Sequence, residues 1–138
     1  MKVFNRFTAL ALISIGAISC QPNGSADEQV LIDTDLAFAD MAEQQGVGAA
    51  FIAYADSNAI IMQNGRFPLK GISEITTVYA NTPTDLSLVW QPEKAEISGS
   101  GDLGYTFGQY TFSNQNTTEK GHYVTIWKKD KQDNGSMY

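Results

Sequence analysis

The chain has 138 residues, of which 43% are hydrophobic, and its 15 acidic and 9 basic residues give a formal net charge of −6. This length is enough for one domain with a hydrophobic core of its own and too short for two. The negative charge repels a phosphate backbone, so we expect no nucleic-acid partner.

The first 19 residues have the pattern of an export signal. Lys2 and Arg6 give a positive start, and an uncharged, mostly apolar run follows over residues 7–17. This run is shorter than the roughly 20 residues of a membrane-spanning helix and has the length of a secretory signal. The sequence Ala17-Ile18-Ser19-Cys20 matches the lipobox of bacterial lipoproteins, in which the signal is cut before a cysteine that carries lipid. An ordinary secreted protein with a chance cysteine here is the disfavoured alternative, because Cys20 is the only cysteine in the chain.

The chain therefore divides into a lipoprotein signal peptide (1–19), a lipidated Cys20 with a flexible tether (20–25) and one domain (26–138). Cleavage removes Lys2 and Arg6 and changes the formal charge from −6 to −8. We expect a cell-envelope lipoprotein that faces the periplasm and reaches the membrane through its lipid anchor. Gln21 is not the aspartate that usually retains lipoproteins at the inner membrane, so the outer membrane is favoured if the organism has one.

The first half of the domain is expected to be mostly helical. The pattern predicts a helix over 25–45, ended by a left-handed Gly46, and an alanine-rich helix over 47–55. A short strand over 59–62 and a turn at Asn64-Gly65 follow, and then a third helix over 71–79.

Strands are predicted over 86–90, 95–99, 105–112 and 122–128. Helices followed by antiparallel strands indicate an α+β fold. Asp133-Asn134-Gly135 is a hairpin signal, but only three residues follow it, fewer than the roughly 5–6 of a typical strand. We therefore expect either that the last strand is truncated in this sequence or that the sheet lacks an edge strand.

Six segments carry a resemblance to a known family. They are residues 35–38, 46–56, 68–71, 90–92, 101–108 and 121–127. In this order they resemble the domain-of-unknown-function 4440 branch, close to the SnoaL-like proteins, of the nuclear transport factor 2-like superfamily. The resemblance implies a cone-shaped α+β fold with about three N-terminal helices packed on a curved antiparallel sheet, a pocket between them and often a homodimer. It also implies a further strand after Gly135.

This superfamily includes isomerases, dehydratases and polyketide cyclases as well as many members without known activity, so the fold does not settle the function. The isomerase arrangement needs an aspartate base after the second helix, where this chain has Gln63, and a tyrosine on the first helix, which is missing around Phe38. Isomerase-like chemistry is therefore disfavoured.

Asp35 is a carboxylate expected on the apolar side of the first helix. At 100° per residue it falls among Leu31, Phe38, Ala39 and Ala42. A desolvated carboxylate suits general acid or base work. The favoured alternative is a structural aspartate that accepts hydrogen bonds from backbone amides or pairs with a basic side chain.

Aromatic and polar side chains on the predicted strands are candidates for lining a pocket. Alternation along a strand places residues 123, 125 and 127 on one face, and residues 105 and 107 share a face of the preceding strand. The alternatives are core positions or a dimer interface. The residues that we expect to line a pocket for a small apolar molecule are Trp90, Tyr105, Phe107, Tyr123, Thr125 and Trp127.

Neither a phosphate-binding loop nor a nucleophile elbow is present, and no metal-ligand spacing is found, so no cofactor and no metal are expected. Three functions remain open. The favoured one is a membrane-anchored pocket domain that binds a small apolar molecule or serves as a dimeric accessory module. The second is a cofactor-independent isomerase, dehydratase or cyclase, with Asp35 as acid or base and Tyr105 or Tyr123 as hydrogen-bond donor. The third is a structural interaction protein whose cavity is filled by its own side chains.

Overall fold

A computed structural model of the chain describes residues 24–129 and 135–137. The predicted signal peptide, Cys20 and the first part of the predicted tether lie outside the described residues. The elements in chain order are α1 (Gly24–Gln45), α2 (Val47–Tyr54), β1 (Ile60–Ile61), β2 (Leu69–Lys70), α3 (Gly71–Tyr79), β3 (Ser87–Ile97), β4 (Leu103–Ser113), β5 (Thr118–Lys129) and β6 (Gly135–Met137). Within the described ranges, no helix has the length and apolarity needed to cross a membrane.

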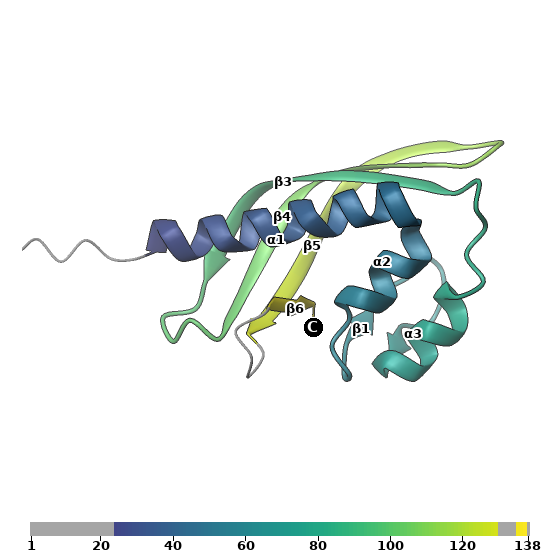
Figure 1. Cartoon of the computed structure of the whole chain (residues 1–138). Helices are drawn as coiled ribbons and strands as arrows, with labels where there is room; N and C mark the ends of the chain where they lie inside the picture. Colours follow the sequence, from purple (N-terminus) through teal and green to yellow (C-terminus); the bar gives the residue numbers. More distant parts are fainter. Residues whose placement is uncertain (1–23, 130–134, 138) are drawn as a thin grey trace, which may run out of the picture.

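The larger sheet is antiparallel, with the strand order β3-β4-β5-β6. Figure 1 shows this sheet curving over α1, with α2, α3 and the two-stranded sheet of β1 and β2 below one end. Three helices thus pack on one face of a curved antiparallel sheet, and the predicted α+β fold is confirmed.

The three helices begin and end close to the predicted positions. Gly46, between α1 and α2, has a φ of +94°, and its N–H donates to the carbonyl oxygen of Ala42 at 3.1 Å. Gly48 lies where α2 meets α3, and a Cβ there would come within 2.2 Å of the carbonyl oxygen of Tyr79. The close packing of these two helices therefore depends on the missing side chain at Gly48.

One boundary was predicted wrongly in the sheet. The separate strands expected over 86–90 and 95–99 form the single strand β3, which shifts register against β4 between Pro92 and Lys94. Proline has no N–H for the ladder, and a β-bulge is one of the places where a strand accommodates it. At the chain's other end, β6 pairs with Trp127–Lys129 of β5, and Gly135 lies in the strand opposite Lys129. The predicted turn residues Asp133 and Asn134 lie outside the described part.

The core is centred on Phe38 of α1, which is 2% exposed. Four aromatic rings surround it with centroids 4.7–6.2 Å away; they belong to Phe51, Tyr54, Trp90 and Trp127. This cluster joins α1 and α2 to β3 and β5, because each of these elements contributes at least one ring. The aromatic contacts hold the helices on the concave face of the sheet.

Candidate functional site

Asp35 of α1 is completely buried between the helix and the sheet. Its Oδ1 accepts a hydrogen bond from Trp90 Nε1 of β3, and its Oδ2 accepts one from the Tyr123 hydroxyl of β5, each at 2.8 Å. The predicted burial of Asp35 is confirmed. The expected partners are wrong, because both donors are neutral aromatic side chains rather than backbone amides or a basic residue.

Tyr123 is the more accessible member of this group. Burial raises the pKa of its hydroxyl well above the ordinary value of 10.0, and the hydrogen bond to Asp35 and the carboxylate charge raise it further. Tyr123 therefore keeps its proton at physiological pH and offers it to Asp35.

A cavity of about 530 Å³ lies beside Trp90 and Tyr123. This volume is within the range of small-molecule sites. The described residues around it are Phe38, Phe51, Ile60, Ile61, Met62, Tyr79, Leu88, Trp90, Tyr110, His122, Tyr123, Val124, Thr125 and Ile126. Asp35 is not on this wall, so Trp90 and Tyr123 stand between the carboxylate and the cavity.

The backbone of β5 forms part of the wall. The N–H of Lys129 donates to the carbonyl of Asp102 at 2.9 Å, so the main-chain groups of odd-numbered residues in β5 point toward β4. Because these directions alternate along a strand, the main-chain groups of His122, Val124 and Ile126 point to the opposite edge. In the described part of the chain, β6 covers that edge only along Trp127–Lys129. The uncovered stretch of β5 borders the cavity.

A second groove of about 540 Å³ lies at the start of α1, beside the turn between β3 and β4. Asp102 of this turn accepts hydrogen bonds from Ser100 and Ser98, and these bonds lower the pKa of its carboxyl. The turn thus satisfies its own polar groups locally. Trp127 is the only aromatic residue along the described wall of this groove, so the cavity beside Tyr123 is the better candidate for an apolar ligand.

The six predicted pocket residues are in three different environments. Trp90, Tyr123 and Thr125 lie on the wall of the cavity beside Asp35. Trp127 is 1% exposed, donates from Nε1 to Thr106 Oγ1 at 2.9 Å and is a core residue that borders only the second groove.

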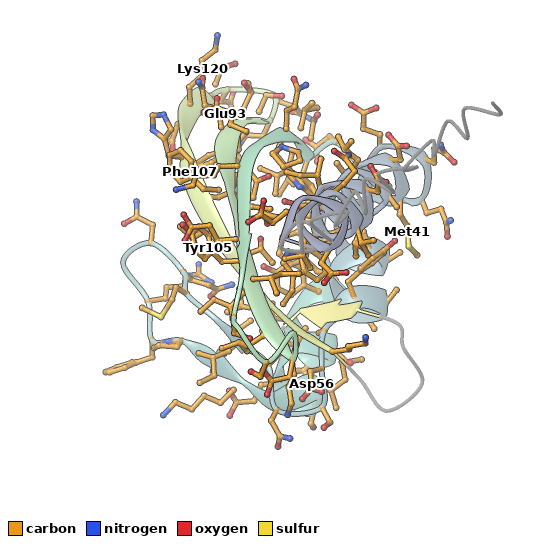
Figure 2. All side chains as sticks on the ribbon, turned by 90° about the vertical axis from the view of Figure 1, so that its left-hand side faces the viewer. Met41, Asp56, Glu93, Tyr105, Phe107 and Lys120 are labelled. Atoms are coloured by element: carbon orange, nitrogen blue, oxygen red, sulfur yellow. The ribbon has the colours of Figure 1, made fainter. Side chains whose placement is uncertain are left out.

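For Tyr105 and Phe107 the prediction is wrong, because both lie on the outer face of the sheet, away from α1 (Figure 2). They pair with Ile126 and Val124, which are 44% and 61% exposed. The ring of Phe107 stacks on that of His122, with centroids 5.6 Å apart. The inward positions of β4 at this level are instead the small residues Thr106 and Gly108.

The cavity also contains side chains that the sequence analysis did not single out. Tyr110 continues the inward face of β4 and pairs with Trp90, so the alternation that placed Tyr123 was a signal for it too. Tyr79 comes from α3, and no pattern along the chain indicates that α3 lies opposite β5. Burial raises the pKa of Tyr79, and a hydrogen bond with the Gln63 side chain opposes that rise. Among the described residues, no three His, Cys, Asp or Glu side chains gather as a metal site.

No family model matches the chain, and no curated protein matches its sequence. Solved structures do match. A protein of unknown function similar to nuclear transport factor 2, from Shewanella oneidensis MR-1, has a TM-score of 0.62 at 15% identity and covers 82% of this chain and 93% of its own. A ketosteroid isomerase-like protein from Erwinia carotovora atroseptica has a TM-score of 0.61 at 16% identity, covering 78% and 88%.

A computationally designed 17-OHP binder has a TM-score of 0.58 at 14% identity and covers 80% of this chain and 92% of its own. At these identities the likeness concerns the fold alone. The chain has the α+β cone fold of nuclear transport factor 2-like proteins.

Proposed function

We propose that the chain is a membrane-anchored, periplasm-facing lipoprotein whose domain binds a small, mostly apolar molecule in the 530 Å³ cavity. The observation that carries the proposal is the composition of the wall. Aromatic rings from α1, α2, α3 and all three long strands line it, and Trp90 and Tyr123 are fixed in place by the buried Asp35. Apolar walls with a few fixed polar groups are typical of ligand sites. The similar fold of a designed 17-OHP binder supports this use of the cavity.

The same geometry favours binding over catalysis. Asp35 is 0% exposed, and each of its oxygens already accepts a hydrogen bond, so it would have to break both bonds to exchange a proton with a substrate. Gln63, which stands where the isomerase base is expected, is neutral and cannot take a proton at physiological pH. The open volume also weighs against a purely structural protein with a filled cavity.

Binding is tested with the neutral fluorescent probe N-phenyl-1-naphthylamine, titrated into the purified protein. We expect one saturable site, and Leu88→Trp should weaken its affinity at least tenfold because the indole fills the cavity that Leu88 borders. Leu103→Trp is the matched control, since Leu103 borders only the second groove. Equal affinity in both variants, or no saturable binding, would contradict the proposal.

The lipid anchor rests on the lipobox that ends at Cys20 and on the absence of another cysteine. Globomycin, which blocks lipoprotein signal cleavage, should make the uncleaved precursor accumulate. Cys20→Ser should abolish labelling by a radioactive fatty acid. Unchanged processing in both experiments would contradict the anchor.

The outer face of the sheet supports the homodimer that the resemblance to the domain-of-unknown-function 4440 branch implies. Val124 and Ile126 are 61% and 44% exposed there. A second copy of this face would cover this apolar surface. Light scattering should give a dimer for the wild type and a monomer for Val124→Glu, and a wild-type monomer at high concentration would contradict the dimer.

A further inference from the structure

The hydroxyl of Tyr123 has a single hydrogen, and the geometry gives it to Asp35. Trp90 Nε1 can only donate, so Oδ1 of Asp35 is an acceptor. Oδ2 of Asp35 receives the hydrogen of the Tyr123 hydroxyl at 2.8 Å. The hydroxyl oxygen keeps its lone pairs but has no hydrogen left for a ligand.

We propose that the cavity prefers ligands that present a hydrogen-bond donor, such as a hydroxyl group, to Tyr123, and that Asp35 sets this preference from behind the wall. This inference rests on the proposed function and adds the chemical class of the ligand. A hydroxyl group can donate to the Tyr123 oxygen. A ketone at the same point faces an oxygen with no hydrogen to offer, and its carbonyl stays unpaired.

Two other tyrosine hydroxyls on the wall compete with that of Tyr123, as do Thr125 and the uncovered main-chain groups of β5. The Gln63 side chain opposes the rise in the pKa of Tyr79, as a donor to its hydroxyl oxygen does, so the Tyr79 hydrogen stays available to a carbonyl. The hydroxyl of Tyr110 has no hydrogen-bond partner within the described part of the chain, so it can donate or accept. A ligand that used Tyr110 would not distinguish a hydroxyl from a ketone. A preference that is lost in Tyr123→Phe therefore identifies Tyr123 as the contact.

Replacing Asp35 with asparagine should invert the preference. The asparagine oxygen must face Trp90 Nε1, because an amide nitrogen at that point would place two N–H donors opposite each other with no acceptor between them. The amide nitrogen then faces Tyr123 and donates to its oxygen. The hydroxyl hydrogen of Tyr123 becomes free to point into the cavity and to bind a carbonyl oxygen.

Calorimetric titration with 1-tetralol and 1-tetralone, which differ only in the hydroxyl and the ketone, tests this inference. The wild type should bind the alcohol about three- to tenfold more tightly, the net effect of one hydrogen bond. Asp35→Asn should favour the ketone. Tyr123→Phe should bring the ratio to about one, whereas Tyr110→Phe should leave the wild-type ratio unchanged. Circular dichroism checks the fold of each variant, and Tyr123→Phe alone decides the matter if Asp35→Asn does not fold.

The measured affinities distinguish a failure of the proposed ligand preference from a failure of the proposed binding function. Binding of both molecules at a ratio of about one in the wild type, or a ratio that responds to Tyr110→Phe instead of Tyr123→Phe, would overturn the inference and leave the binding function intact. A wild-type preference for the ketone would mean that Tyr123 points its hydrogen into the cavity. Binding of neither molecule, together with no saturable N-phenyl-1-naphthylamine site, would overturn the binding function and the inference with it.

Discussion

Asp35 joins the first helix to two strands through side chains 55 and 88 residues farther along the chain. A buried carboxylate costs stability unless its oxygens are hydrogen-bonded, and here each oxygen has one donor. The arrangement fixes the Trp90 ring and the Tyr123 ring at the cavity wall. The polar group is thus a positioning element in an otherwise aromatic core.

Removal of one donor should reveal the cost of an unpaired buried oxygen. Tyr123→Phe leaves Asp35 Oδ2 without its partner and should lower the free energy of unfolding by about 1–3 kcal/mol. Tyr110→Phe is the matched control, because it removes a hydroxyl without a hydrogen bond in the described part of the chain and should cost less than about 0.5 kcal/mol. Urea unfolding measures both, and equal losses would contradict the role of the bond.

Alkaline pH should destabilise the fold through the same residue. Folding raises the pKa of Tyr123 above its ordinary value of 10.0, so this contribution is fully present below pH 10 and is lost as the pH rises beyond it. We expect a loss of at most about 1.4 kcal/mol per pH unit from Tyr123. Urea unfolding between pH 8 and 11.5 should show a smaller slope for Tyr123→Phe than for the wild type. Tyr54 and Tyr79, whose pKa values are also raised, should leave a smaller loss of stability with rising pH in this variant. Identical slopes would contradict this assignment.

The burial of Asp35 was predictable from helical periodicity, but its donors were not. Periodicity acts within one helix, whereas the position of Trp90 and Tyr123 depends on how β3, β4 and β5 align. Tyr105 and Phe107 illustrate the same limit. Alternation correctly places them on one face of β4. It does not tell which of the two faces meets the helix, because that depends on how α1 packs against the sheet. Leu31 of α1 packs on Gly104, where a Cβ would come within 2.5 Å of Leu31 Cδ1.

At the scale of elements, the helices were the more predictable part. Each is bounded by residues whose effects are local, such as Gly46 with its positive φ. The strand β3 was predicted in two parts because Pro92 normally interrupts a ladder, and the bulge that accommodates it exists only once β4 is paired alongside. Local signals therefore set the helices, while pairing between strands sets the extent of β3.

The contact between α2 and α3 is the element-level feature most sensitive to a single methyl group. Gly48→Ala would place a Cβ within 2.2 Å of the Tyr79 carbonyl oxygen, so the two helices must separate. We expect a net loss of about 1–3 kcal/mol in unfolding free energy, despite the roughly 1 kcal/mol that alanine gains in helix propensity. Gly99→Ala, with nothing within 4 Å of its Cβ, is the control. Thermal unfolding that ranks the two variants equally would contradict this packing.

At the scale of the whole molecule, the cavity lies near the second half of α1, because Phe38 borders it. Asp27 and Val30, in the first half of the helix, border the second groove. In the proposed lipoprotein, the lipid on Cys20 is four residues from the start of α1, at most about 14 Å along an extended chain. The first turns of α1 would then lie close to the membrane, and the cavity would lie toward the far end of the helix.

The two tryptophans of the chain allow a direct test of ligand binding in the cavity. Trp90 is on the cavity wall, whereas the Trp127 indole N–H is bonded to Thr106 in the core. In a ¹H–¹⁵N spectrum titrated with 1-tetralol, we expect the Trp90 indole signal to move and the Trp127 signal, assigned with Trp127→Phe, to stay in place. Movement of the Trp127 signal alone would place the ligand in the second groove, and no movement of either signal at saturating 1-tetralol would contradict binding in the cavity.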